Sequence, residues 1–213
     1  MSTNKKNKNN ELIRRCYSVN LETREQNGSG IIEGQPIVFN SLANLGYFEE
    51  MIMPGALDGT DLNDVRLCLN HDTSYVYARS RRNNPNSTME LNVIPDGMRI
   101  RANLAIDESP KAKDFFTAIT RGDIDKMSFM FSIDEEEWER LDSDYPLRKI
   151  KKIGSVVEVS AVTFPAYEAT QIDARSKEAL ESAREKRDVN SVETEDKNEL
   201  ELLKEKFIFM SKF

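Results

Sequence analysis

The chain has 213 residues, a formal net charge of −7 and 31% charged residues. This length favours one domain of about 150 residues with appendages, which is large enough to form a core without disulfides or metal. The acidic balance disfavours a broad phosphate-binding surface, so we expect no nucleic-acid partner. No apolar run approaches the roughly 18 residues that span a bilayer, and the first residues lack an apolar signal core, so we expect neither a membrane partner nor secretion.

Histidine and cysteine are scarce in this chain. His71 is the single histidine, and Cys16 and Cys68 are the two cysteines. These three side chains are too few for a closed zinc site, which needs four cysteine or histidine ligands. We therefore expect reduced thiols, no metal and no cofactor.

Short strands dominate the predicted elements in chain order. Residues 1–10 are rich in Asn and Lys and are predicted to be a disordered arm. The domain is expected over residues 11–175. Its predicted strands cover residues 12–19, 30–39, 65–70, 87–94, 98–106, 127–133, 147–153 and 156–163. Pro95-Asp96-Gly97 predicts a tight turn between two antiparallel strands. Ser109 and Pro110 predict the start of one helix, which Gly122 ends.

The composition changes after about residue 175. More than half of residues 176–206 are charged, and their apolar stripes are thin. This pattern predicts a solvated helical tail over residues 176–213, in two pieces divided near residues 188–191. The tail ends in an apolar segment from Phe207 to Phe213, which either packs on its own domain or docks on a partner.

His71 is the first candidate for chemistry because it is unique. It follows the predicted strand Val65–Asn70, and alternation places it on the same face as Val65, Leu67 and Leu69. An imidazole there is either a core histidine bonded to backbone or a general base, because an unperturbed imidazole titrates near pH 6.5 and can take and return a proton. The same alternation points Cys68 to the opposite face, which disfavours a Cys–His pair.

Ser128 is the candidate nucleophile. Met127, Phe129 and Phe131 form an apolar face of their strand, so Ser128 points the other way from a rigid element. Rigid presentation suits nucleophilic catalysis. The alternative is an ordinary serine on a strand surface.

Glu158 is the third candidate for chemistry and lies within the run Val156–Val162. A carboxylate among valines is costly to bury unless it is paired, and pairing with imidazole would fix the histidine tautomer. The alternatives are a solvated strand position for Glu158, or a role for Asp72 or Asp123 in its place.

Taken together, four ordered segments resemble the prohead proteases of tailed bacteriophages, which are serine peptidases. The segments run from Gly46 to Leu57, from Asp64 to Asp72, from Arg121 to Phe129 and from Val157 to Ala166. They span roughly residues 11–175 in order, so the resemblance covers a whole domain.

The resemblance implies a fold and a set of catalytic residues. This family is similar to herpesvirus maturation proteases, so it implies an α+β, mainly β fold: a mostly antiparallel β-barrel with a few surrounding helices. Both groups place a histidine first and the serine second, which assigns His71 and Ser128. The herpesvirus enzymes use a second histidine as third member, whereas here the resemblance assigns Glu158 because the chain has no other histidine.

The implied activity is peptide-bond hydrolysis through an acyl-enzyme. Backbone N–H groups near Ser128 would hold the oxyanion, which makes Phe129 and Met130 weak candidates, with Arg79 as a further one. Met130 stands where family members often have glycine, and Ala78-Arg79-Ser80 stands where Gly-Arg-Thr is common.

The resemblance also implies partners and a location. The expected substrates are the phage major capsid protein, its scaffolding segment and the protease itself, inside a procapsid assembling in the host cytoplasm. The enzyme is expected to form at least a dimer. The tail would bind scaffold or be removed by self-cleavage. The alternative is a non-catalytic capsid assembly factor on the same fold, and a cysteine peptidase built on Cys68 is a third interpretation.

Overall fold

The computed structural model describes residues 11–17, 21–164 and 176–189, and residue 204. The predictions for the N-terminal arm and for the apolar end of the tail lie outside these residues. The elements are β1 (Leu12–Tyr17), β2 (Glu22–Gln26), β3 (Ser29–Val38), β4 (Leu42–Asn44), β5 (Glu49–Ile52), β6 (Asp64–Leu69), β7 (Ala78–Arg81), β8 (Met89–Ile94), β9 (Gly97–Leu104), α1 (Pro110–Thr120), β10 (Lys126–Glu139) and β11 (Leu147–Val162).

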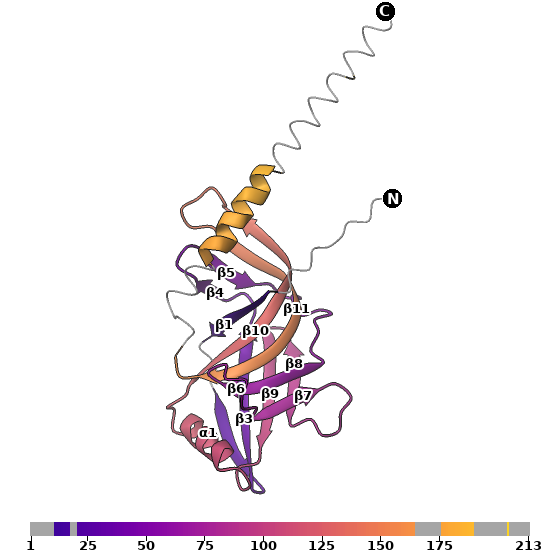
Figure 1. Ribbon diagram of the computed structural model, residues 1–213, viewed down its shortest axis with the longest axis vertical. Coiled ribbons are helices and arrows are strands. Elements are labelled where there is room, and N and C mark those ends of the chain that lie inside the picture. The colour runs from indigo at the N-terminus through magenta and orange to yellow at the C-terminus, as the bar shows by residue number, and fades with distance from the viewer. Residues whose placement is uncertain (1–10, 18–20, 165–175, 190–203, 205–213) are drawn as a thin grey trace, which may run out of the picture.

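Two β-sheets make up most of the structure (Figure 1). The larger sheet has seven strands in the order β1-β10-β11-β5-β4, with β6 and β7 attached beside β11. The smaller sheet has four strands in the order β2-β3-β9-β8. The fold is α+β and mainly β, as expected. Among the described residues neither sheet closes on itself, so the predicted barrel is not confirmed.

The long hairpin of β10 and β11 organises the larger sheet. The two strands pair antiparallel, with Ser128 opposite Ser160 and Met130 opposite Glu158. The other edge of β11 pairs in parallel with β5 near its start and with β6 near its end. The sequence predicted β11 as two separate strands. This hairpin brings β6, which precedes His71, against the strand that carries Glu158.

The core lies where the sheets meet. Alternate side chains of β10, namely Met127, Phe129 and Phe131, are fully buried, and they join a cluster that includes Ile32 and Ile100 of the smaller sheet. The predicted apolar face of β10 is therefore confirmed. Its other face carries Ser128, which is also fully buried.

Local sequence signals explain the predicted helix and turn. Ser109 caps α1 by accepting a hydrogen bond from the Ala112 N–H, and Gly122 follows the helix with a φ of 80°. Pro95 and Asp96 connect β8 to β9, where Gly97 is required. A Cβ at Gly97 would lie 1.9 Å from the Ile37 carbonyl oxygen of β3.

The first part of the charged segment is helical and contacts the body. Residues 176–189 form a helix at the β4–β5 end of the molecule (Figure 1). Leu180 is 6% exposed and packs with Leu45 and Phe48. The Arg184 side chain donates to the carbonyl oxygens of Leu141 and Ser143, each at 3.1 Å.

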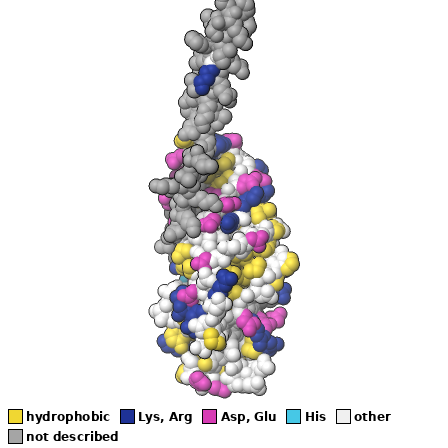
Figure 2. All heavy atoms as spheres, turned by 90° about the vertical axis from the view of Figure 1, so that its right-hand side faces the viewer, with side chains coloured by type: hydrophobic (Ala, Val, Ile, Leu, Met, Phe, Trp, Pro, Cys, Tyr) yellow, Lys and Arg dark blue, Asp and Glu magenta, His cyan; other side chains and the backbone are white. Residues whose placement is uncertain are grey.

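Charges of both signs share the surface. Figure 2 shows acidic and basic side chains interspersed over one face, with no large area of one sign. None of the helices in the described part of the chain has the length and apolar content of a bilayer-spanning segment.

Candidate active site

Strained backbone at the end of β6 positions His71. Asn70 and His71 have φ values of 51° and 61°, in the left-handed region that non-glycine residues rarely adopt. Hydrogen bonds, three of them from backbone N–H groups, hold this turn against β11. The Asn70 N–H donates to the Ala161 carbonyl at 3.0 Å, the His71 N–H to Ser160 Oγ at 3.0 Å, and the Thr163 N–H to Asn70 Oδ1 at 2.9 Å. Such strain is typical of functional sites.

This turn moves the imidazole to a face that alternation did not predict. Parallel pairing sets Glu158 beside Arg66 and Ser160 beside Cys68, and paired residues share a face. His71 contacts Glu158 and Ser160, so its ring lies on the Cys68 face rather than with Leu67. Counting by two fails here because it assumes extended backbone through residue 71.

Glu158 is the carboxylate that holds His71. Its Oε2 lies 2.7 Å from His71 Nδ1, and its Oε1 accepts the hydroxyl proton of Ser160. The Glu158 side chain is only 2% exposed, so this pairing satisfies a buried carboxylate. The carboxylate also selects the tautomer with the proton on Nδ1.

The two competing aspartates lie elsewhere. Asp72 is exposed and accepts the Ser74 N–H at 2.9 Å. Asp123 is also exposed and forms an ion pair with Arg121 at 3.0 Å. Neither has a hydrogen bond to His71 among the described residues, so the geometry favours Glu158 as the orienting group.

The second ring nitrogen of His71 makes no hydrogen bond to the described residues. This atom, Nε2, is buried. A neutral imidazole with its proton on Nδ1 has an accepting lone pair on Nε2. In this tautomer Nε2 can accept a proton.

Ser128 lies in the next strand, on the same face. It is directly opposite Ser160, and cross-strand partners have Cβ atoms about 4.5–5.5 Å apart. Its buried hydroxyl donates to the Arg15 carbonyl of β1 at 2.9 Å. In the described part of the structure no hydrogen bond joins Ser128 to His71. The structure thus joins His71, Glu158 and Ser160 directly and sets Ser128 beside them.

The remaining predicted residues have other contacts. The Phe129 side chain is buried and stacks on Phe131 with a centroid distance of 4.5 Å. Met130 is half-buried opposite Glu158. The Arg79 guanidinium lies on β7 and makes two hydrogen bonds to Asp64, at 2.6 and 2.7 Å. Their predicted oxyanion roles stay predictions.

Cys68 is close to the site but is poorly suited to be a nucleophile. Burial, with the Glu158 charge as a second cause, raises the pKa of the Cys68 thiol to about 12. Because the thiolate is the reactive form, this environment keeps the sulfur inert near neutral pH. The interpretation as a cysteine peptidase is disfavoured on this ground.

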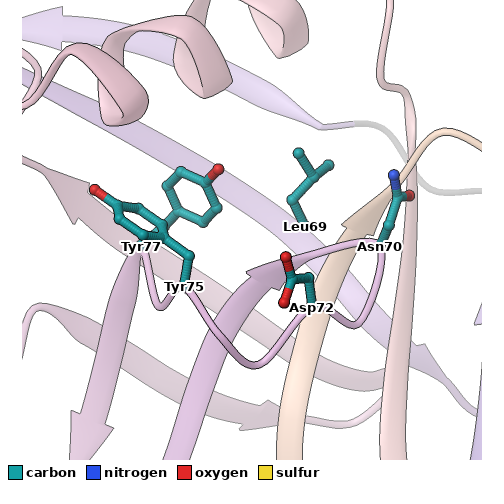
Figure 3. Close-up of a pocket in the computed structure, with 5 residues that line it drawn as sticks. All are labelled: Leu69, Asn70, Asp72, Tyr75 and Tyr77. Atoms are coloured by element: carbon teal, nitrogen blue, oxygen red, sulfur yellow. The ribbon is translucent and has the colours of Figure 1, made fainter.

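A small pocket flanks the site beyond β6. It has a volume of about 180 Å³ and is lined by Leu69, Asn70, Asp72, Tyr75 and Tyr77. Figure 3 shows the two tyrosines together on one side and Asn70 and Asp72 on the other. His71 lies between two of the lining residues in sequence but does not line the pocket itself.

Ser160 was not predicted as a site residue. It joins the His71 backbone to the Glu158 carboxylate. The sequence held one signal for it, because Ser160 follows Glu158 by two residues and must share its face of β11.

A protein-family model matches residues 17–185, described as the caudovirus prohead serine protease family. The chain belongs to this family. The matched region contains His71, Ser128 and Glu158 and extends into the docked helix of residues 176–189. Searches of curated proteins and of solved structures find no match.

Membership of the prohead protease family implies a serine peptidase of phage capsid maturation. It also implies association with phage capsid proteins. Within the described residues, no group of three or more His, Cys, Asp or Glu side chains is placed to hold a metal ion.

Proposed function

We propose that this prohead protease family member is a serine endopeptidase with a Ser128–His71–Glu158 triad. The observation that carries the proposal is the buried His71–Glu158 pair, 2.7 Å between Nδ1 and Oε2, with Nε2 left as an acceptor. Ser128 is on the same sheet face, one strand away. The order of the three residues also agrees with the family resemblance.

The chemistry follows from these positions. Ser128 Oγ forms a bond to the carbonyl carbon of the scissile peptide, and its proton passes to His71 Nε2. The imidazolium then gives this proton to the leaving amine as the C–N bond breaks. Water repeats the sequence to hydrolyse the acyl-enzyme. Glu158 stabilises the imidazolium throughout, and Ser160 fixes the carboxylate that does so.

Before reaction, the Ser128 hydroxyl must turn from the Arg15 carbonyl to His71 Nε2. Hydroxyl rotation is intrinsically fast, and unliganded sites often have loose catalytic hydrogen bonds. The oxyanion would be held by backbone N–H groups near Phe129 and Met130. Removal of one such donor typically costs about 2.7–4 kcal/mol of barrier.

The proposed substrates are the major capsid protein with its scaffolding segment, and the protease itself. Cleavage would take place inside the procapsid, in the host cytoplasm, by an enzyme that is at least a dimer. We divide the chain into a protease domain over residues 11–175 and a segment over 176–213 that binds scaffold or is removed by self-cleavage.

The rival function is a non-catalytic capsid assembly factor on the same fold. The observation that favours it is the Ser128 hydroxyl, which is bonded to the Arg15 carbonyl and not to His71. This rival predicts that Ser128 has no activated hydroxyl under any condition.

Self-processing tests the proposal. The full-length chain is concentrated, and its intact mass is followed over days beside the Ser128→Ala variant. We expect the wild type to be trimmed while Ser128→Ala stays intact. Equal trimming of both proteins would assign the cleavage to a contaminating protease and contradict the proposal.

A further inference from the structure

Strand β1 covers the edge of the strand that carries the nucleophile. It is the outermost strand of the larger sheet and pairs antiparallel with β10 (Figure 1). The register sets Leu12 opposite Ser132 and Cys16 opposite Ser128. The paired stretch therefore spans the whole neighbourhood of the nucleophile. An extended peptide that pairs with β10 at this edge must first displace β1.

The contact between β1 and Ser128 resembles that of a bound peptide. The nucleophile hydroxyl donates to the main-chain carbonyl of Arg15, with 2.9 Å between the oxygens. A productive substrate presents a main-chain carbonyl to the same oxygen, with reacting atoms about 3–3.5 Å apart. The Arg15 carbonyl thus fills space beside the nucleophile that a substrate main chain would need, although it presents its oxygen, and not the carbon that would be attacked, to Ser128 Oγ. While it stays there, it also keeps the Ser128 proton away from His71.

Apart from Arg15, the described side chains of β1 contribute little to the buried core. Leu12 and Arg14 are exposed, Cys16 is half-buried, and Ile13 is half-buried and packs against the margin of the core. Main-chain pairing of this kind can be remade by another extended segment, as in strand addition to a sheet edge. Another extended segment could therefore replace β1 in its pairing with β10.

One ion pair provides the specific anchor. The Arg15 guanidinium binds both carboxylate oxygens of Glu50 on β5, with Nη2 to Oε2 at 2.8 Å. Glu50 is fully buried and also accepts a hydrogen bond from Arg148 Nη1 at 3.2 Å. Loss of Arg15 would therefore release β1 and still leave Glu50 with a cationic partner.

We propose that β1 is an internal blocking strand, which occupies the site where the main chain of an extended peptide substrate pairs with β10. The inference rests on the proposed function for the identity of the substrate, but the occlusion itself is a structural claim. Release of β1 frees the β10 edge and the Ser128 hydroxyl together. The active form is then the one in which a peptide segment, from another copy or from a capsid protein, has replaced residues 12–17.

A reversible disulfide between β1 and β10 tests this. Leu12→Cys with Ser132→Cys joins directly opposite residues of an antiparallel pair, whose Cα separation of about 4.5–5.5 Å suits a disulfide. The full-length chain carries Cys16→Ser to prevent mispairing. The matched control, Leu42→Cys with Met51→Cys, locks the β4–β5 edge of the same sheet. Each protein is compared oxidised and reduced.

Two measurements separate occlusion from catalysis. The first is the labelling rate of Ser128 by a serine-directed fluorophosphonate. The second, made in a Ser128→Ala background, is the binding of a fluorescent peptide of residues 11–17 with serine in the position of Cys16. We expect oxidation of the β1–β10 lock to reduce both by at least tenfold, with recovery on reduction. Arg15→Ala should raise the labelling rate and the peptide binding. Oxidation of the control disulfide between β4 and β5 should change neither quantity.

The outcomes are distinguishable. Equal labelling of the oxidised and reduced β1–β10 lock would overturn the blocking strand and leave the peptidase in place. Peptide binding that depends on the lock, without labelling in any form, would support the blocking strand and contradict the peptidase. Absence of both labelling and peptide binding in the reduced lock and in Arg15→Ala would overturn both.

Discussion

At the scale of single residues, Ser160 connects His71 to Glu158, the two residues of the proposed catalytic pair. Its hydroxyl accepts the His71 N–H at 3.0 Å and donates to Glu158. We expect Ser160→Ala to slow fluorophosphonate labelling of Ser128 by about tenfold to a hundredfold, as is typical when a group that orients a catalytic residue is lost. The same change leaves a buried N–H unsatisfied, so the unfolding midpoint is measured beside the rate.

Ser132→Ala is the matched control for this variant. Ser132 is also a buried serine of the larger sheet, and it bonds to Ser155 at 3.0 Å. The Ser132→Ala variant should be less stable than wild type, but the labelling rate of its Ser128 should not fall to a comparable degree. Equal labelling by Ser160→Ala and wild type would show that Ser160 does not position the pair.

Cys68 gives a second prediction at this scale. Burial and the neighbouring Glu158 charge raise the pKa of its thiol to about 12, so the thiolate is scarce at neutral pH. We expect iodoacetamide at pH 8 to leave Cys68 unmodified in the folded protein and to modify it after denaturation, as measured by peptide mass mapping. Rapid alkylation of the native protein with loss of activity would return the cysteine peptidase to consideration.

The residue types of the site could be predicted from the sequence, but their relative placement could not. Uniqueness made His71 a candidate, and the family resemblance chose Glu158 over Asp72 and Asp123 as the third residue. Alternation placed His71 on the wrong face, because the left-handed backbone at Asn70 and His71 is fixed by tertiary hydrogen bonds to β11. The contact of Ser128 with Arg15 joins positions 113 residues apart, which no local pattern reveals.

At the scale of elements, the helix of residues 176–189 has one buried apolar side chain, Leu180, beside the hydrogen bonds of Arg184. Leu180 packs on Leu45 and Phe48, apart from the main core. We expect Leu180→Ala to cost about 2 kcal/mol, the lower end for a buried leucine, and to detach the helix. Tryptic cleavage within residues 176–189 should become at least tenfold faster.

Val189→Ala is the control for the docked helix, because Val189 is 59% exposed and has little packing to lose. Its tryptic cleavage rate should match that of wild type. If Leu180→Ala is cleaved no faster than Val189→Ala, the contact with Leu45 and Phe48 does not hold the helix.

Local signals predicted most elements, including α1 with its serine cap and the β8–β9 turn. They could not predict which strands pair. The parallel contact of β6 with β11 joins Arg66 to Glu158, and the pairing of β1 with β10 is similarly distant. Both depend on long-range burial, which a single sequence pattern does not encode.

At the scale of the whole molecule, Glu50 links strands that lie far apart in the sequence. It is buried between Arg15 of β1 and Arg148 of β11. Burial alone would raise its pKa, but the two guanidinium groups outweigh this and hold the pKa below the ordinary value of 4.5. The stability that Glu50 contributes is therefore present above pH 4.5 and is lost as the pH falls through the lowered folded pKa.

Glu50→Gln tests this link by urea unfolding between pH 7 and pH 3. Removal of the charge leaves two guanidinium groups without their shared partner, so we expect a loss of about 3–5 kcal/mol at pH 7. The difference in the free energy of unfolding between Glu50→Gln and wild type should become smaller below pH 4.5. The control Glu137→Gln removes an exposed ion pair with Lys151 and should change little. A difference that does not vary with pH would contradict the assignment.

The sequence pattern of short strands, like the family resemblance, predicted a mainly β domain. It could not predict two sheets in place of a barrel, because closure depends on strand tilt and register. It also could not predict how residues 176–189 would associate with the body, since their thin apolar stripe fits a solvated helix equally well.

Activation of Ser128 by His71 is the claim on which the proposed function depends. The direct measurement is fluorophosphonate labelling of the full-length, concentrated protein, with the adduct located by peptide mass mapping. We predict a single adduct on Ser128, with a rate that falls on the order of 10⁴-fold in Glu158→Gln and further in His71→Ala. No adduct on Ser128, in wild type or in the Arg15→Ala variant that releases β1, would contradict the account and favour the assembly factor.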